Sequence, residues 1–205
     1  MEDIVQEIQY GIMVGEFRPK QRLVELDLMR QFSVGRGLIR DSLKILADRG
    51  LVSRNDNKGA VVIEFSPKQI QDLYFLRSHL EGLAAELAFD RIKSKEIEEM
   101  SRPQELLKRY GKVDKTLVQM HETFHETIFK ASGNDFLFSE IKRLIILSGP
   151  VRYFAYTHPE QKRRVIQEHD EILRLLKQRD KHKFVGYCRN HMIPTMEEYI
   201  RIFYP

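Results

Sequence analysis

Apolar side chains recur at every third or fourth position along most of the chain, which is the spacing of amphipathic helices. In the first part of the chain these stripes are short and predict three helices. They run from Ile4 to near Gly15, over about residues 26–32, and over about residues 37–49. Gly50 follows the third stripe as a helix stop, because glycine readily adopts the left-handed conformation found after helices.

The pattern after Gly50 changes to two short strand-like runs. Residues 51–53 and 60–63 are the predicted strands, and the polar segment 55–59 is the turn between them. Asn, Asp and Gly dominate that turn, and these residues accept the positive φ angles of tight hairpins. Three helices followed by a two-stranded hairpin predict a winged helix-turn-helix, with its short turn at residues 33–36.

The rest of the chain is predicted to be almost uninterrupted helix. Six amphipathic helices are expected, at about residues 67–91, 94–110, 114–131, 135–156, 159–178 and 181–203. Three prolines inside these ranges should kink or interrupt them: Pro103, Pro150 and Pro194. The predicted fold is therefore mainly α, with a winged helix-turn-helix domain at 1–66 and an all-α six-helix bundle at 67–205.

Composition adds limited information about the setting and the partner. No apolar run approaches the ~18 residues of a membrane span, and the acidic N-terminus lacks a signal-peptide pattern. The single Cys188 fits a reduced, cytoplasmic location. The net charge of +4 permits a nucleic acid partner without requiring one. Basic residues gather around the third helix and the hairpin: Arg30, Arg36, Arg40, Lys44, Arg49, Arg54 and Lys58.

Four histidines supply the candidate chemistry of the helical part. His121 and His125 are four residues apart, so they share one face of a predicted helix. His169 and His191 each lie on the apolar stripe of a later helix. A lone histidine on such a stripe is usually an ordinary core residue. A set of four that can converge between packed helices predicts a metal site instead.

Several motifs together resemble one family of regulators. The first part is similar to the GntR-family winged helix through Arg22–Glu25, Val34–Leu43, Leu46–Val52 and Lys58–Val62. The second part resembles the FadR-like effector domain of that family, often called FCD. Its marks here are Arg77 with Leu80-Glu81, Phe124-His125, Ala131–Asn134, Glu168-His169 with Ile172-Leu173, and His191.

The resemblance implies how double-stranded DNA would be read. The second helix of a helix-turn-helix enters the major groove with its N-terminal residues at the base edges. Arg36 and Arg40 match the family's arginines there, and arginine reads guanine through O6 and N7. The family usually has Ser or Thr before the first arginine, whereas this chain has Gly35. The other expected contacts are Gly37 through its backbone N–H, Lys44 to phosphate, and Lys58 and Gly59 at the wing tip.

The resemblance also implies a metal-binding effector domain. Metal sites of FadR-like domains use one Asp or Asn and three histidines, and the histidine positions match His125, His169 and His191. His121 stands where an Asp is usual. Imidazole suits zinc, nickel and copper, and Zn²⁺ or Ni²⁺ is the expected ion. Four neutral ligands leave the full charge on the ion, which should attract an anionic effector.

The expected effector is a small organic acid bound by the metal and by Arg77, which matches a cavity arginine of the family. Arg143 and Tyr153 are further candidates for effector binding, and Arg152 is a neighbouring one. Effector binding is expected to change the separation of two winged helices in a homodimer, and so its affinity for a pseudo-palindromic operator.

Three alternatives remain open from the sequence. The ion itself can be the signal of a metal-responsive repressor. An open metal position can also activate water, as in a metal-dependent hydrolase. A metal-free regulator would bind anions directly through the histidines and Arg77. No motif places a general base among the histidines, although Glu122, Glu126 and Glu168 flank them, so a regulator rather than an enzyme is predicted.

Overall fold

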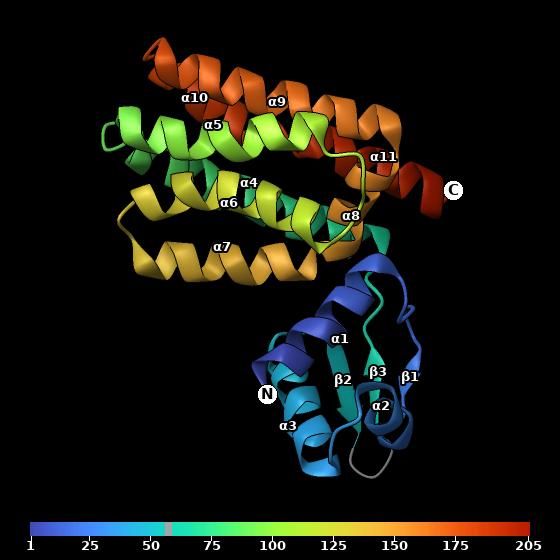
Figure 1. The fold of residues 1–205 in the computed structure, drawn as a ribbon. Helices are drawn as coiled ribbons and strands as arrows, with labels where there is room; N and C mark the ends of the chain where they lie inside the picture. The colour runs from blue at the N-terminus through green and yellow to red at the C-terminus, as the bar shows by residue number, and fades with distance from the viewer. Residues whose placement is uncertain (56–58) are drawn as a thin grey trace. The chain divides into compact units, whose positions relative to one another are not determined.

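The computed structural model describes residues 1–55 and 59–205. The chain divides into two compact units, which Figure 1 shows as ribbons. The first unit comprises Met1–Ser66 together with the segment Ile146–Pro150, and the second comprises Pro67–Ile145 and Val151–Pro205. Within the described residues, no helix is long and apolar enough to cross a membrane.

The first unit is a winged helix whose three helices lie where the apolar stripes predict them. They are α1 (Glu2–Val14), α2 (Glu25–Phe32) and α3 (Arg36–Asp48). Gly15 ends α1 with a φ of 81°, and Gly50 follows α3 with a φ of 79°. These left-handed positions are the ones at which glycine avoids the strain that a Cβ atom would cause.

The sheet of this unit has one more strand than the predicted hairpin. The hairpin strands are β2 (Val52–Asn55) and β3 (Gly59–Val62), and β1 (Arg22–Leu23) pairs antiparallel with the other edge of β3. Leu23 lies opposite Ala60, and both side chains are buried. Two residues are too few for a period-two pattern, so β1 exists through its pairing partner rather than through a local signal.

A single apolar core fixes the orientation of α3. Ile39, Leu43 and Leu46 of α3 are buried against Ile8 of α1 and Val62 of β3. Burying each of these side chains is worth about 1.5–3 kcal/mol, which firmly sets the rotation of the helix. The opposite face of α3 is therefore the one that remains exposed.

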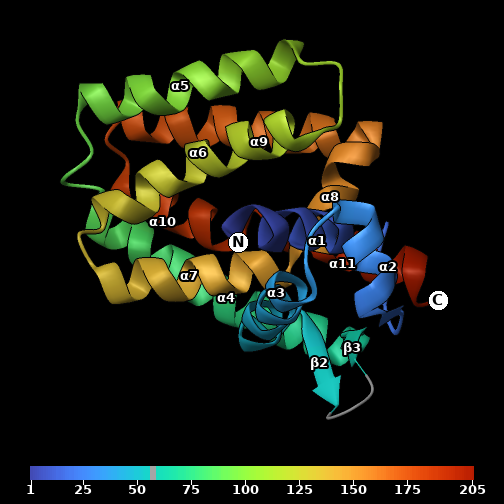
Figure 2. The same cartoon turned by 60° about the horizontal axis from the view of Figure 1, so that its bottom comes forward.

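The second unit is built around a ring of five helices (Figures 1 and 2). The ring consists of α4 (Pro67–Ala88), α5 (Ser94–Arg109), α6 (Lys115–Ala131), α9 (Pro159–Lys177) and α10 (Lys181–Asn190). Within it, α6 packs against α5 and α4, α10 packs against α4 and α9, and α9 closes the ring on α5.

Two of the six predicted helical segments are divided at prolines, as their positions indicate. The segment predicted at 135–156 forms α7 (Asp135–Leu147) and α8 (Gly149–Thr157), with Pro150 in the first turn of α8. The last predicted segment forms α10 and then α11 (Ile193–Phe203), with Pro194 in the first turn of α11. Proline suits a first turn because its missing N–H has no helical partner there.

Pro103 does not interrupt its helix. Helix α5 runs through it, with Met100 and Leu107 buried on either side. Packing of α5 against α6 and α9 holds the two halves in one helix despite the lost hydrogen bond, since tertiary contacts override intrinsic propensity.

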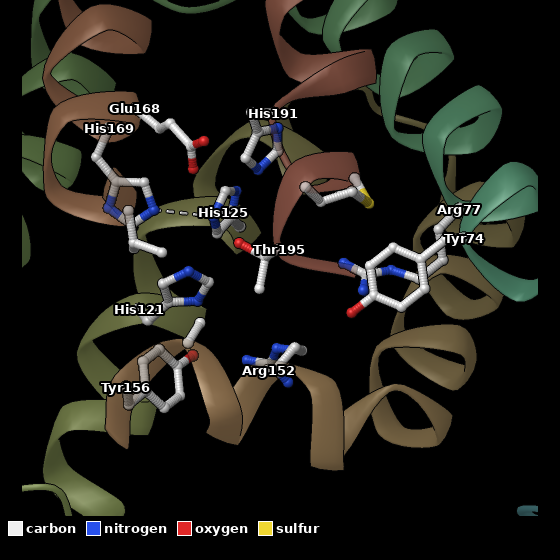
Figure 3. Close-up of a pocket in the computed structure, with 13 residues that line it drawn as sticks. Tyr74, Arg77, His121, His125, Arg152, Tyr156, Glu168, His169, His191 and Thr195 are labelled. Carbon is white, nitrogen blue, oxygen red and sulfur yellow. Dashed lines mark hydrogen bonds between the residues drawn. The ribbon is translucent and has the colours of Figure 1, made fainter. Parts of the chain in front are cut away.

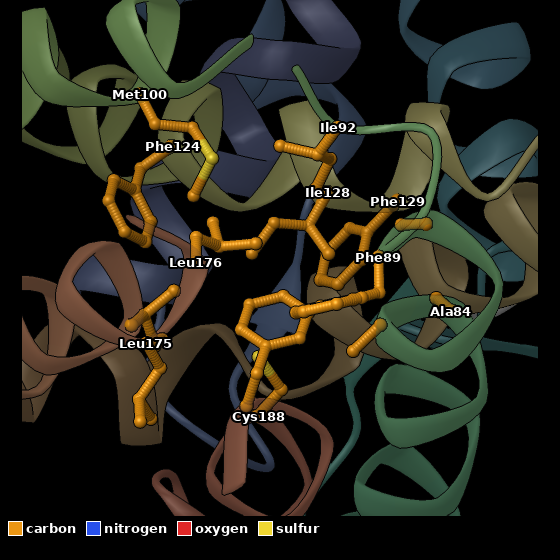
Figure 4. Packing of buried hydrophobic residues seen from close by; sticks show 14 of the residues in the cluster. Ala84, Phe89, Ile92, Met100, Phe124, Ile128, Phe129, Leu175, Leu176 and Cys188 are labelled. Carbon is orange, nitrogen blue, oxygen red and sulfur yellow. The ribbon is translucent and has the colours of Figure 1, made fainter. Parts of the chain in front are cut away.

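Figure 4 shows the apolar core inside the ring, where side chains from facing helices interlock. Phe124 and Ile128 of α6 meet Leu176 of α9 and Phe184 of α10 in this cluster. The core extends to the histidines, because the ring of Phe124 stacks on His169 with centroids 4.0 Å apart. The polar cavity described below thus borders tightly packed apolar side chains, which restrict the motion of its walls.

Candidate functional site

The exposed face of α3 carries a row of basic residues. Arg36, Arg40 and Lys44 follow one another at intervals of four, so they share one helix face, and all three are exposed. Gly35 is the N-cap residue and makes no side-chain capping bond. Gly37 is exposed with open space where a side chain would project, so another molecule can approach its backbone closely.

Both arginines of this row lie near one acidic side chain. Glu25 of α2 is 3.7 Å from the Nε of Arg36 and 3.5 Å from the Nε of Arg40. The arginine side chains are 64% and 60% exposed. Exposed ion pairs of this kind contribute about 0–1 kcal/mol. Glu25 therefore orients the two guanidinium groups without holding them away from another anion.

Gly59 has a structural role that does not depend on the predicted contact with DNA. Its φ is 79°, and a Cβ atom there would lie 3.1 Å from the backbone oxygen of Leu23. Glycine is required where the strand begins so close to β1. The predicted contact of Lys58 lies outside the described residues.

The second unit contains a small cavity of about 50 Å³ that is partly open to solvent (Figure 3). Helices α4, α6, α8, α9 and α11 and the end of α10 contribute its lining. The polar side chains of that lining are Tyr74, Arg77, His121, His125, Arg152, Tyr156, Glu168, His169, His191 and Thr195. All four histidines predicted as ligands thus reach one cavity.

Three of the histidine rings, those of His121, His125 and His169, are close enough to share an ion. The Nε2 atoms of His125 and His169 are 3.1 Å apart, and one ring nitrogen from each of His121, His125 and His169 lies within 4.8 Å of the others. His191 stacks on His125 with ring centroids 5.2 Å apart. Two nitrogens bound tetrahedrally to one zinc ion would be about 3.3 Å apart, given Zn–N bonds of ~2.0–2.1 Å. The arrangement therefore fits a metal.

A glutamine that the sequence did not single out orients His169. Gln104 donates from Nε2 to the carbonyl of Ile166 (2.9 Å) and to the carboxylate of Asp170 (3.0 Å), which leaves its Oε1 as an acceptor. His169 Nδ1 lies 2.9 Å from this Oε1, so it carries the proton and its Nε2 presents a lone pair to the cavity. Such outer partners typically fix the tautomer of a metal-binding histidine.

His191 is held in the same way by a backbone group. Its Nδ1 lies 2.9 Å from the carbonyl oxygen of Cys188 and donates to it, which leaves Nε2 as the atom with a lone pair. In His121 the buried Nδ1 has no hydrogen-bond partner among the described residues. A buried lone nitrogen of this kind is the atom that a metal ion or a ligand would satisfy.

Burial keeps the four imidazoles neutral. It lowers the pKa of His121, His125 and His169 well below 6.5 and lowers the pKa of His191 as well, and the neighbouring rings add to the effect for His121, His125 and His169. Neutral imidazole is the form that binds metals, so at neutral pH no proton has to leave these groups first. Burial also raises the pKa of Glu168, at the edge of this cluster, to about 7.

Arg77 lines the cavity and also makes a buried ion pair. Its Nη2 donates to Glu81 at 2.7 Å, and the two side chains are only 7% and 2% exposed. The i+4 pairing that the sequence allows is thus present together with the predicted cavity position. Unlike the surface pair at Glu25, this pair is shielded from water.

Helix α8 presents Arg152 and Tyr156 to the cavity, not the predicted Tyr153. Arg152 and Tyr156 are four residues apart on one face, and Tyr153 is rotated away from that face by one residue. Arg152 Nη1 donates to Glu122 at 3.1 Å. Arg143 likewise lies outside the lining of this cavity, where its exposed side chain pairs with Glu140 at 3.0 Å.

The fold defines a winged-helix protein of the DNA-binding class, joined to a helical domain that contains a cavity. The chain matches the bacterial regulatory proteins of the gntR family over residues 1–62 and the FCD domain over residues 72–193. It belongs to the GntR family of transcriptional regulators and carries an FCD effector domain, which makes it a DNA-binding regulator and not an enzyme.

Individual relatives agree with this assignment. The chain is 23% identical to the HTH-type transcriptional regulator McbR of Escherichia coli, over 98% of this chain and 91% of McbR. It is 28% identical to the gluconate operon transcriptional repressor of Bacillus subtilis, over 87% of this chain and 76% of that protein. The solved structure of Escherichia coli McbR superposes with a TM-score of 0.79 at 22% identity, covering 99% of this chain and 96% of McbR.

Proposed function

We propose that this regulator senses a small organic acid through a divalent metal ion, Zn²⁺ or Ni²⁺, held by His121, His125, His169 and His191. The observation that carries the proposal is the convergence of four neutral imidazoles on one cavity, two of them with lone pairs fixed by outer partners. When bound, the ion supplies a Lewis-acidic anchor for a carboxylate. Arg77, on the same cavity, supplies a second attraction for the acid.

DNA recognition is assigned to the exposed face of α3 and the wing. Arg36 and Arg40 would read base edges in the major groove, since both are exposed at the helix start and only weakly paired. Lys44 and the backbone N–H of Gly37 would contact phosphates. Lys58 and Gly59 would contact the DNA backbone or minor groove from the wing.

A row of leucines on α4 supports the proposed homodimer. Leu76, Leu83 and Leu87 are exposed, and Leu73 and Leu80 are half-buried. These five residues repeat at alternating intervals of three and four, which is the spacing of a helix seam that packs against another helix. A second copy offers an identical apolar row, as a two-fold interface requires.

The dimer is tested by measuring molar mass in solution. Leu83→Asp should place a charge in the seam and convert the dimer to a monomer. Leu106→Asp is the matched control, because Leu106 is also exposed but lies on α5. A dimer that persists in Leu83→Asp to the same extent as in the control would contradict this interface.

The proposed switch couples the cavity to DNA binding. An acid that binds between helices from different parts of the ring would favour one arrangement of the helical unit and so one spacing of two winged helices. Couplings of this kind are typically about 1–3 kcal/mol, or 5- to 150-fold in operator affinity.

Elemental analysis and operator binding test the proposal together. The purified protein should contain about one Zn²⁺ or Ni²⁺ per chain, and operator affinity should change when an organic acid is added but not after chelation. The cavity beside the histidines favours an organic effector over the metal ion as the signal. An ion held weakly, with operator affinity that follows its free concentration alone, would instead identify a metal-responsive repressor.

A further inference from the structure

One wall of the cavity carries polar groups that the proposed metal does not use. Arg152 and Tyr156 of α8 lie across the cavity from His169 and His191 in Figure 3. Both side chains are buried. The Tyr156 hydroxyl lies beside the Arg152 guanidinium, which can only donate to it, and its own proton has no acceptor among the described residues. Burying a hydroxyl proton without an acceptor costs free energy, so the position of this group indicates a missing acceptor.

Arg152 supplies the charge beside that hydroxyl. A guanidinium has five N–H donors in a planar fork, and the bond to Glu122 is made by Nη1. Arg152 lines this cavity together with Tyr156, and it also lines a neighbouring pocket together with Glu122.

We propose that Arg152 and Tyr156 form a second anion subsite, so that the effector is a dicarboxylate with one carboxylate at the histidine cluster and the other at this pair. The inference rests on the proposed function and specifies its ligand. Two oxygens of a carboxylate match two N–H groups of a guanidinium, and one of them can also accept from the tyrosine hydroxyl. A monocarboxylate bound at the histidines would leave the hydroxyl of Tyr156 unsatisfied.

Succinate and butyrate provide the matched pair of probes, because both have four carbons and they differ in the second carboxylate. Their dissociation constants are measured by calorimetry on metal-loaded full-length protein, with metal content determined on the same samples. We expect succinate to bind at least about tenfold more tightly than butyrate, since a charge-assisted bidentate pair contributes that much. Malonate, glutarate and adipate then identify the preferred length.

Three variants on α8 test the residues. Arg152→Gln should remove the preference for succinate while butyrate binding and metal content stay unchanged. Tyr156→Phe keeps the volume and removes only the hydroxyl, and it should reduce succinate binding about three- to tenfold. Tyr153→Phe is the control, because Tyr153 is on the same helix outside the cavity lining. If Arg152→Gln does not fold, Tyr156→Phe against Tyr153→Phe decides the question.

The subsite and the metal proposal fail in different ways. A preference for succinate that survives in both Arg152→Gln and Tyr156→Phe, or equal binding of succinate and butyrate by the unmodified protein, would overturn the subsite. Tighter binding of phosphoglycolate than of any dicarboxylate would overturn the assignment of the second group as a carboxylate. The purified protein could also contain no metal and still prefer succinate in a way that depends on Arg152. That result would refute the proposed metal site and support the anion subsite.

Discussion

Arginine and glutamate are paired in both units of the protein, but in opposite surroundings. On the winged helix, Glu25 lies 3.5–3.7 Å from two exposed arginines, Arg36 and Arg40. In the helical unit, Arg77 and Glu81 meet at 2.7 Å with almost no exposure to water. The same two chemical groups therefore interact weakly in one unit and strongly in the other, because water and salt screen only the first pair.

This difference suits two kinds of ligand. DNA phosphates and bases can take arginines away from Glu25 at small cost, and the exchange should depend on salt. A ligand in the cavity has to replace interactions of buried groups, so it must match their charge and geometry closely. The surface is suited to rapid exchange among many DNA sites, and the cavity to selection of one small molecule.

The largest effect is expected when the buried pair is broken. Arg77→Met leaves Glu81 in a shielded position without its guanidinium, and we expect a loss of about 3–5 kcal/mol in the free energy of unfolding. Urea denaturation of the metal-free protein measures this value. Arg77→Met combined with Glu81→Leu should restore most of the loss, because no unpaired charge remains.

The exposed pair of Arg201 and Glu198 is the matched comparison for that experiment. Arg201→Met should change the unfolding free energy by less than about 1 kcal/mol. If Arg77→Met costs no more than Arg201→Met, the contrast between buried and exposed pairs is wrong.

Substitution of one of the proposed metal-binding histidines should have the next largest effect, on metal affinity. His125→Ala should weaken metal binding by at least about 100-fold, more than loss of an outer partner does. Gln104→Leu removes the acceptor that orients His169, together with the bonds that Gln104 donates to Ile166 and Asp170, and should weaken metal binding by about 10- to 100-fold. His79→Ala is the control, since His79 is exposed outside the cavity lining. Competition with a fluorescent chelator gives the affinities, and equal values for His125→Ala and His79→Ala would exclude His125 as a ligand.

Substitutions on the exposed face of α3, which we propose to bind DNA, should have smaller effects that differ in kind. Arg36→Ala should lose about 1–3 kcal/mol of discrimination between operator and unrelated DNA. Lys44→Ala should weaken binding to all DNA about equally and reduce the slope of log affinity against log salt by about 1. Fluorescence anisotropy over a range of salt concentrations separates the two. Retention of sequence preference in Arg36→Ala would remove this residue from base reading.

The features predicted correctly from the sequence are those that depend on the local spacing of apolar residues. The helices of both units and the stops at Gly15 and Gly50 follow from spacing and from the properties of glycine, and the prolines at 150 and 194 indicated where long helices divide. Strand β1 escaped prediction because only its pairing with β3 makes it a strand. The spacing of apolar residues indicates the conformation of a segment but does not identify the distant segment that pairs with it.

The candidate site shows the same limit. The histidines were singled out because His121 and His125 share one helix face, because His169 and His191 lie on apolar stripes, and because three of the four, all but His121, match histidine positions of the family. Gln104 acts on His169 from another helix of the ring, and nothing in its own segment indicates that contact. Arg152 and Tyr156 face the cavity because α8 starts at Gly149, and a prediction that ran one helix from 135 to 156 could not set the rotation of residues 152–156.

The smallest effect is expected at Glu25, and it tests the comparison most directly. Glu25→Gln removes the charge shared by Arg36 and Arg40 but keeps a side chain of the same size. Because both pairs are exposed, DNA affinity should rise by less than about fivefold at low salt. The rise should disappear as salt approaches 1 M, where the screening length falls to about 3 Å. A change above tenfold, or one that persists in high salt, would show that Glu25 holds the arginines as firmly as Glu81 holds Arg77.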